Sequence, residues 1–199
     1  MTTSWDAAAQ HPPSPRDAAG ASAAAEVTLG LAVPVPEPWA ARLTAEREAT
    51  GDPVARSVPP HVTLVPPVVV PADAVAAVLA HVRDRVRTRR SFTLRLRGTG
   101  TFRPVSQVSF VTVADGAAEC DDLQEHVRCG PLTRRLGFPY HPHVTVGHDV
   151  PDDALDAAED RLADFDVSFT VASVSLFRCG TDGVWRVLAD APLEGRPLA

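Results

Sequence analysis

Apolar and polar residues alternate along several segments of the chain, and this two-residue period is typical of half-buried strands. Other segments repeat apolar residues every three or four positions, as amphipathic helices do. The predicted strands are residues 26–33, 61–65, 92–96 (extending towards 102), 107–113, 143–146, 166–177 and 185–188. The predicted helices are residues 39–49, 72–90, 120–136 (with a break at Gly130-Pro131 as an alternative) and 152–163.

The order of these elements is strand, helix, strand, helix, strand, and the same order then repeats. It predicts a duplicated α+β fold with two lobes, each a small, mainly antiparallel sheet backed by helices, on either side of a central cleft. We expect the domain to cover residues 26–199, with lobes of about 26–104 and 105–199; exchange of strands between the lobes stays open. Residues 1–25 are rich in Ala, Pro and Ser without an apolar period, which predicts a disordered tail.

Composition narrows the functional class. The chain has 199 residues and a formal net charge of −6, which argues against a protein that coats long nucleic acids but allows a pocket for one phosphate. No apolar run approaches the ~20 residues that span a bilayer, and the N-terminus lacks the pattern of a signal peptide. We therefore expect a cytoplasmic protein without a membrane partner, and a monomer.

Cys120, Cys129 and Cys179 lack the close spacing of a zinc site, and we expect neither a metal nor a cofactor.

Two of the predicted strands begin with the same pattern, Pro-His-Val-Thr followed by an aliphatic residue. Side chains two residues apart on a strand point the same way. His61 and Thr63 therefore share one face of the first strand, and His143 and Thr145 share one face of the second, while the aliphatic residues face the core. A matched pair in the same flanking sequence is far less expected by chance than a single His-x-Thr motif.

Two imidazoles around one phosphorus atom would supply both proton transfers that phosphodiester transfer needs. A neutral imidazole takes the proton from the attacking water or hydroxyl, and a protonated one gives a proton to the leaving oxygen. Imidazole suits both roles because its unperturbed pKa of ~6.5 lies near working pH. The two threonine hydroxyls can donate hydrogen bonds to the non-bridging phosphate oxygens. This pattern does not assign base and acid between His61 and His143.

With these two motifs the chain resembles the 2H phosphoesterase superfamily, in its bacterial 2′-5′ RNA ligase-like and cyclic phosphodiesterase group. The resemblance implies an enzyme that needs neither metal nor ATP and hydrolyses 2′,3′-cyclic phosphates, cleaves or joins 2′-5′ linkages, or acts on related cyclic nucleotides. Its expected partner is an RNA end or a nucleotide that carries such a phosphodiester. It also implies His61 and His143 as the catalytic pair and Thr63 and Thr145 as phosphate ligands. Related sequences often carry Arg or Lys shortly after the second motif, where this chain has His148.

Four further residues are candidates for auxiliary roles. Tyr140 and Phe102 lie near predicted cleft strands, where an aromatic ring can stack on a base. Arg103 can pair with a phosphate oxygen, and His148 can do so when it is protonated.

Two other interpretations stay open. The same cleft could bind a nucleotide or an RNA end without turnover, although pure binding does not need two groups that transfer protons. A metal site could use His141, His143 and His148, although their spacing is not a helical zinc signature and no nearby Cys or Glu completes it.

Overall fold

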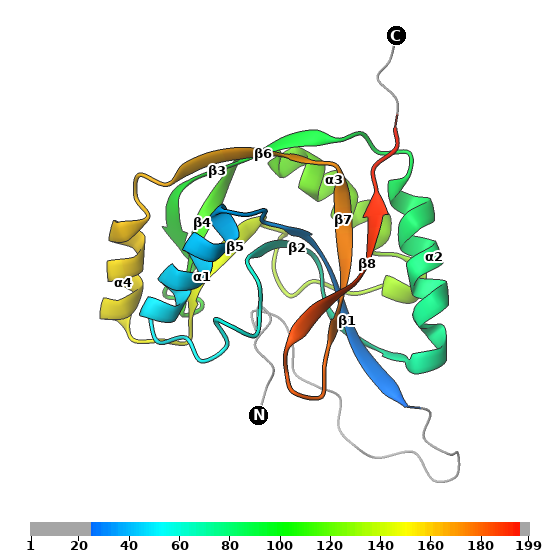
Figure 1. Cartoon of the computed structure of the whole chain (residues 1–199), viewed down its shortest axis with the longest axis horizontal. Coiled ribbons are helices and arrows are strands. Elements are labelled where there is room, and N and C mark those ends of the chain that lie inside the picture. Colours follow the sequence, from blue (N-terminus) through cyan, green and yellow to red (C-terminus); the bar gives the residue numbers. More distant parts are fainter. Residues whose placement is uncertain (1–24, 196–199) are drawn as a thin grey trace.

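The computed structural model describes residues 25–195, which form two four-stranded sheets with helices packed on them (Figure 1). The strands are β1 (Glu26–Pro34), β2 (His61–Pro71), β3 (Phe92–Thr101), β4 (Val108–Asp115), β5 (His143–His148), β6 (Asp166–Val171), β7 (Ser173–Cys179) and β8 (Trp185–Pro192). The strand order is β2-β1-β7-β8 in the first sheet and β5-β4-β3-β6 in the second, and every neighbouring pair is antiparallel. The predicted α+β fold is confirmed. The expected tail, residues 1–25, lies outside the described residues except for Ala25.

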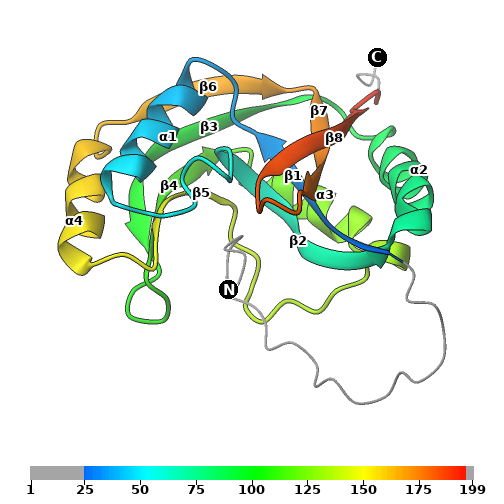
Figure 2. The same ribbon diagram turned by 60° about the horizontal axis from the view of Figure 1, so that its bottom comes forward.

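Two pairs of helices cover the two sheets. The helices are α1 (Trp39–Ala49), α2 (Val75–Val86), α3 (Ala117–Val127) and α4 (Asp152–Arg161), with short 3-10 turns at Ala72–Ala74 and Gly130–Leu132. Helices α1 and α4 pack mainly on the second sheet, whereas α2 and α3 pack mainly on the first (Figures 1 and 2). Each lobe is therefore one sheet backed by two helices.

Each sheet takes strands from both halves of the chain. Strand β3, which ends before residue 104, joins the second sheet, while β7 and β8 return to complete the first sheet beside β1. A boundary near residue 104 therefore does not separate the two sheets. Because each sheet contains strands from both halves of the chain, the two lobes are not independent domains.

A β-bulge follows the threonine of each motif. Leu64 is the extra residue directly after Thr63 in the pairing of β2 with β1. Val146 is the extra residue directly after Thr145 in the pairing of β5 with β4. The same irregularity at the same place in both halves supports a duplicated origin of the fold, since bulges are specific local features rather than defects.

The prediction of one strand over residues 166–177 is wrong. The chain leaves β6 at Val171 and enters β7 at Ser173, and these two strands belong to different sheets. Side chains at odd positions are the more buried ones up to Val171, whereas residues 174–177 of β7 are all buried. In the sequence, the apolar residues change from the odd positions up to Val171 to the even positions Val174 and Leu176, and the chain crosses between the sheets at this change.

The first motif strand is longer than predicted. It continues past residue 65 to Pro71, through Pro66 and Pro67. Proline lacks the amide donor of a central strand, but β2 is the edge of its sheet, where proline is tolerated.

Two predicted helices are shorter in the structure. The helix expected over 120–136 ends at Val127, because Gly130 with a φ of 55° and Pro131 break it, as the alternative had anticipated. Residues 133–142 form an irregular loop instead. The helix expected over 72–90 begins with a 3-10 turn and ends at Val86.

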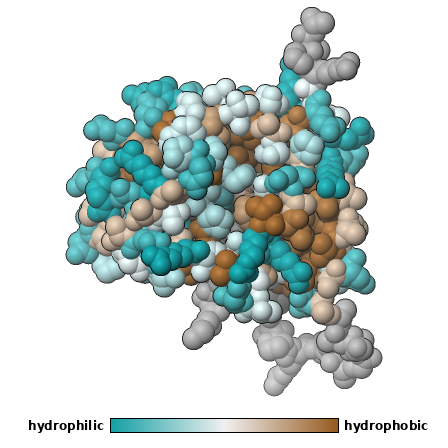
Figure 3. All heavy atoms as spheres, viewed as in Figure 1, coloured by the Kyte–Doolittle hydropathy of each residue, from teal (hydrophilic) through white to brown (hydrophobic). Residues whose placement is uncertain are grey.

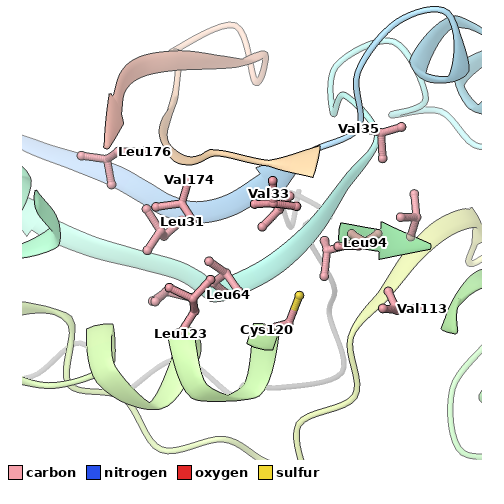
Figure 4. Packing of buried hydrophobic residues seen from close by; sticks show 14 of the residues in the cluster. Leu31, Val33, Val35, Leu64, Leu94, Val113, Cys120, Leu123, Val174 and Leu176 are labelled. Carbon is pink, nitrogen blue, oxygen red and sulfur yellow. The ribbon is translucent and has the colours of Figure 1, made fainter. Parts of the chain in front are cut away.

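The hydrophobic core joins the two motif strands to the helices. In Figure 4 the side chains of Leu64 on β2 and Leu123 on α3 lie close together, and Leu31 on β1 and Val174 on β7 belong to the same core cluster. All four side chains are at most 2% exposed. Each contributes roughly 1.5–3 kcal/mol by burial. The residue that follows the motif threonine in β2 therefore anchors that strand to the core.

The outer face seen in Figure 3 is largely hydrophilic over α1 and α4, whereas apolar residues gather to the right of its centre. Strand β8 lies in front on that side in Figure 1 and carries the exposed Val187 and Leu188. Within residues 25–195, no helix has the length and apolar character needed to cross a membrane.

A buried ion pair holds the loop that leads from α1 to the first motif. Arg47 Nε lies 2.7 Å from Asp52 Oδ2, and the two side chains are 6% and 1% exposed. The other carboxylate oxygen of Asp52 accepts the Val54 amide at 3.0 Å. Further on, the Trp185 amide of β8 donates to the Ser57 carbonyl at 2.8 Å. The loop is thus fixed at both ends before it reaches His61.

Asp52→Ala should lower the free energy of unfolding by about 3–5 kcal/mol, because it leaves the buried Arg47 guanidinium without its counter-ion. Urea denaturation followed by circular dichroism measures this change. The matched control is Arg56→Ala, which removes an exposed ion pair with Glu48 from the same region and should change stability little. Equal losses in the two variants would contradict this account.

Candidate active site

The two motif strands are edge strands of their sheets and lie against each other. Strands β2 and β5 are in contact, although they are not hydrogen-bonded in one sheet. The hydroxyl of Tyr140, just before the second motif, donates to the Thr63 backbone carbonyl at 2.8 Å. The fold therefore brings the first motif, in one sheet, and the second motif, in the other, to one place.

Both motif histidines are oriented by the same backbone contact. His61 Nδ1 lies 2.7 Å from the Pro59 carbonyl oxygen, and His143 Nδ1 lies 2.7 Å from the His141 carbonyl oxygen. A carbonyl oxygen only accepts hydrogen bonds, so Nδ1 of each ring carries a proton. Nε2 is therefore the nitrogen that gains and loses a proton in each ring.

His61 occupies the more enclosed position. It is 8% exposed, and its Nε2 lies 3.1 Å from Thr63 Oγ1, which confirms that these two side chains share one face. The Phe177 ring lies 6.4 Å from its ring, centroid to centroid. Phe177 belongs to a small apolar cluster with Ala32, Val58 and Trp185, formed by β1, the α1–β2 loop and the β7–β8 hairpin. This cluster closes one side of the first motif.

His143 lies among aromatic rings. Phe102 meets its ring edge-on, with centroids 4.9 Å apart and planes at 87°, and Phe110 lies 5.1 Å away. The His141 ring lies 6.0 Å from that of His143 and contacts the same two phenylalanines. Burial, and then the charge of His143, lower the pKa of His141 below the ordinary value for histidine.

Gly100 on β3 makes room for this arrangement. It pairs with Phe110 across the sheet, and a Cβ at this position would lie 2.8 and 2.9 Å from two carbons of the Phe110 ring. These separations are too short for carbon atoms, so only glycine leaves the ring where it contacts His143.

A cavity of about 530 Å³ opens beside the two motifs. Its walls come from β2, from the turn between β3 and β4, and from the loop 133–142. The described residues that line it are Thr63, Leu64, Pro66, Thr101, Phe102, Val105, Ser106, residues 136–141 and His143. Most of these side chains are apolar, and Val105 and Phe138 are 72% and 52% exposed at its walls.

The sequence candidates Tyr140 and Phe102 both line this cavity. The contacts already described give each a structural role, since Tyr140 joins the two motifs and Phe102 packs on His143. Stacking of either ring on a base remains a prediction. Thr145 is half-buried on β5 and pairs with Phe110, on the strand face that carries His143.

Arg103 has a different role from the phosphate contact that the sequence suggested. Its guanidinium is bound by three acidic side chains of α4, with Nη1 3.2 Å from Asp152 and Nη2 2.7 Å from both Asp156 and Glu159. These contacts, with the Asp156 hydrogen bond first, raise the pKa of Arg103. Arg103 therefore anchors the β3–β4 turn, which carries Phe102, to α4 instead of lining the cavity.

His148 is also removed from the cavity. It is 4% exposed, and its Nε2 lies 3.6 Å from a carboxylate oxygen of Asp149. Five residues of strand separate it from His143, which is roughly 15 Å at the rise of an extended chain. One phosphate cannot contact both rings. The interpretation of His141, His143 and His148 as a metal site is contradicted for the same reason, and residues 25–195 contain no cluster of three His, Cys, Asp or Glu that could hold a metal ion.

Sequence reasoning missed two residues around the histidines. Phe110 and Phe177 have the pattern of ordinary core residues of strands, and only the pairing of the strands brings them to the motifs. His141 was named only as a possible metal ligand. Its spacing of two residues from His143 orients side chains alike in an extended chain, but the intervening Pro142 leaves the direction of the preceding side chain uncertain.

Paired sheets with a His-x-Thr motif on an edge strand of each define the class of 2H phosphoesterases. The sequence model of the 2′-5′ RNA ligase superfamily matches residues 34–183, and the chain belongs to this family. The resemblance inferred from the two motifs is thereby confirmed.

Relatives and solved structures agree with this assignment. A Bacillus licheniformis protein named "Putative phosphoesterase" is 31% identical over 102 residues, which is 51% of this chain and 60% of that protein. A Bacillus mycoides protein with the same description is 27% identical over 140 residues, covering 68% of this chain and 80% of the relative. The crystal structure of the Thermus thermophilus protein TT0787 matches with a TM-score of 0.56 and 26% identity, covering 85% of this chain and 100% of that one. E. coli LigT, crystallised with 3′-AMP, shares the fold with a TM-score of 0.60 at 20% identity, covering 85% and 99%.

Gly100→Ala should displace the Phe110 ring and lower the free energy of unfolding by about 1–3 kcal/mol, as overpacking does. The NMR signals of the His143 imidazole should shift in the same variant, because the neighbouring ring moves. Adding Phe110→Leu should restore much of the stability by removing the ring carbons that clash. If Gly100→Ala is as stable as the parent and leaves the His143 signals in place, Gly100 has no part in positioning this histidine.

Proposed function

We propose that this protein is a metal-independent phosphoesterase that opens phosphodiesters such as the 2′,3′-cyclic phosphate of a nucleotide or of an RNA end. Reversible formation or cleavage of a 2′-5′ linkage uses the same chemistry. The observation that carries the proposal is the matched anchoring of His61 and His143. Each Nδ1 is held by a backbone carbonyl two residues earlier, which leaves Nε2 as the working nitrogen in both motifs.

The reaction needs two proton transfers and no redox partner. One imidazole, neutral at Nε2, takes a proton from water as the water oxygen forms a bond to phosphorus. The other, protonated at Nε2, gives its proton to the ribose oxygen as the bond between that oxygen and phosphorus breaks. The product is a phosphomonoester. The two imidazoles end with exchanged protonation states, and solvent restores them.

Thr63 and Thr145 would stabilise the charge that grows on the non-bridging oxygens. Their hydroxyls are hydrogen-bond donors, and each stands two residues after its histidine on the same face of the strand. Donors aimed at developing charge lower the barrier more than they strengthen substrate binding. The aromatic wall of Phe102, Phe110 and His141 would keep the His143 ring in one orientation.

The shape and lining of the cavity support a nucleotide-sized substrate. A volume of about 530 Å³ is within the ~300–1,000 Å³ that is usual for small-molecule sites. Its apolar walls suit a ribose and a base. Among proteins that share the fold, LigT has been crystallised with 3′-AMP and with phosphate, which is in keeping with such a ligand. Tyr140 and Phe102 are the rings on which a base would stack.

His61→Ala and His143→Ala should each reduce turnover by about 10²–10⁴-fold, which is the usual contribution of a positioned general acid or base. The double variant should be little worse than the weaker single variant, because the two groups act as a unit. The assay is a panel of nucleoside 2′,3′-cyclic phosphates, an RNA with that terminus and 2′-5′ oligonucleotides, with the product identified by chromatography. His126→Gln, on α3 and outside the cavity, serves as the control. Near-normal turnover in either alanine variant would remove the assignment, and tight binding without turnover by the parent protein would favour a non-catalytic role.

The rate should follow a bell-shaped curve in pH. At low pH the base is already protonated, and at high pH the acid has lost its proton, so activity falls on both sides. The two falling sides of the curve give two apparent pKa values, which belong to the pair of histidines rather than to either one. We expect both between ~5 and ~8, because free imidazole has a pKa near 6.5. The measurement is cyclic phosphate opening across pH, with and without excess chelator. A rate that chelation abolishes and zinc or manganese restores would refute the two-histidine mechanism, since a metal would then supply the hydroxide.

A further inference from the structure

The charge balance of the cavity raises a question about phosphate binding. A phosphodiester carries a full negative charge, and buried or half-buried anions need a positive partner. None of the described residues that line the cavity is Arg or Lys. In the adjoining segments, Arg103 is bound to acidic side chains of α4, and Arg134 donates a hydrogen bond to the Pro67 carbonyl.

His141 is the lining group that can supply a charge besides the motif histidine. Its ring lies 6.0 Å from that of His143, centroid to centroid, and both rings pack on Phe102 and Phe110. A phosphate group that lies against the His143 ring is therefore close to the His141 ring as well. His141 is exposed, so a ligand can reach it without movement of the chain.

We propose that His141 is a substrate-binding residue that becomes protonated when the phosphodiester binds and supplies the positive charge opposite the phosphate. This inference rests on the proposed function and adds to it a third imidazole, outside the two motifs. The imidazoles of His61 and His143 are then left for proton transfer, while the imidazole of His141 holds the anion.

The surroundings of His141 determine how its charge depends on pH. The β3–β4 turn and β4 face it with Phe102 and Phe110, which are uncharged. On β5 the titratable group is His143, and on its own loop Tyr140 is the neighbour, with its hydroxyl donated to the Thr63 carbonyl. Partial burial against the neighbouring rings and the charge of His143 lower the pKa of His141, which favours the neutral ring in the free protein. A bound phosphodiester acts in the opposite direction and favours the protonated ring.

The sign of the effect follows from linkage. Binding of an anion that prefers protonated His141 takes up a proton, so affinity must rise as pH falls through the pKa of His141. A phosphodiester keeps its single charge over this range and contributes no titration of its own. The KM of the cyclic phosphate should therefore be lower at pH ~5.5 than at pH ~8, about one unit below and 1.5 units above the pKa of free imidazole.

Two substitutions at this position separate charge from hydrogen bonding. His141→Gln keeps a polar side chain without a titrating proton, and it should raise KM roughly tenfold at pH ~5.5, the loss expected for one charge-assisted hydrogen bond, with little change at pH ~8. His141→Arg supplies a permanent charge, so its KM should stay low at both pH values. In both variants kcat should stay close to that of the parent protein at each pH, because His61 and His143 are intact.

The experiment measures KM and kcat for adenosine 2′,3′-cyclic phosphate at both pH values in the parent protein, the two variants and His126→Gln. His126→Gln is the matched control: the same exchange at a histidine that bonds within its own helix, and it should behave as the parent does. An active parent protein with the same KM in His141→Gln at pH ~5.5 would overturn the inference alone. A parent protein that opens none of the phosphodiesters of the panel would overturn the proposed function and this inference together.

Discussion

Each motif strand has to bury aliphatic residues on one face and carry its histidine and threonine on the other, and the rest of the molecule is arranged around that constraint. In β2 the residues Val62 and Leu64 are at most 1% exposed in the core, while His61 and Thr63 face away from it. Because successive side chains of a strand point to opposite faces, one strand can do both without distortion of its backbone. The bulge directly after the threonine then ends the strict alternation, and the edge position of both strands lets the two sheets meet at their motifs.

The two halves keep the same backbone solution but give the two imidazoles different environments. Both rings are oriented by the carbonyl two residues earlier, and both are followed by a bulged aliphatic residue. His61, however, lies beside the apolar cluster under the β7–β8 hairpin, whereas His143 lies among Phe102, Phe110 and a second imidazole. The duplicated motifs thus share one backbone arrangement but place their imidazoles in unlike surroundings, one enclosed by an apolar cluster and the other by aromatic rings.

The sequence was most informative where one local rule decides the outcome. The starts of the motif strands, the helix 39–49 and the α+β class could be predicted from alternation, from the residues that begin and end a helix, and from the order of the elements. The break between Val171 and Ser173 needed attention to a change of phase, and the strand through Pro66 and Pro67 needed knowledge that β2 lies at an edge. Arg103 could not be assigned from sequence, since its partners Asp156 and Glu159 stand more than fifty residues away and meet it only in the folded sheet. Non-local pairing is the information that a single sequence carries least directly.

The same ion-pair network explains why an acidic protein can have a cavity without fixed charge. Helix α4 presents Asp152, Asp156 and Glu159 to the β3–β4 turn, and Arg103 forms ion pairs with all three while donating a hydrogen bond to Thr101. An arginine held by three carboxylates leaves only at a large cost, because the acidic side chains would lose their shared counter-ion. The turn is thereby fixed with Phe102 against His143, and the cation that stabilises it is withdrawn from the substrate side. Among the described residues, the lining of the cavity then contains neither Arg nor Lys. For the proposed function, this charge distribution suits a small or terminal phosphodiester that is held by close contacts. Binding to the interior of a long strand relies on counter-ion release, which grows with each phosphate that basic side chains contact.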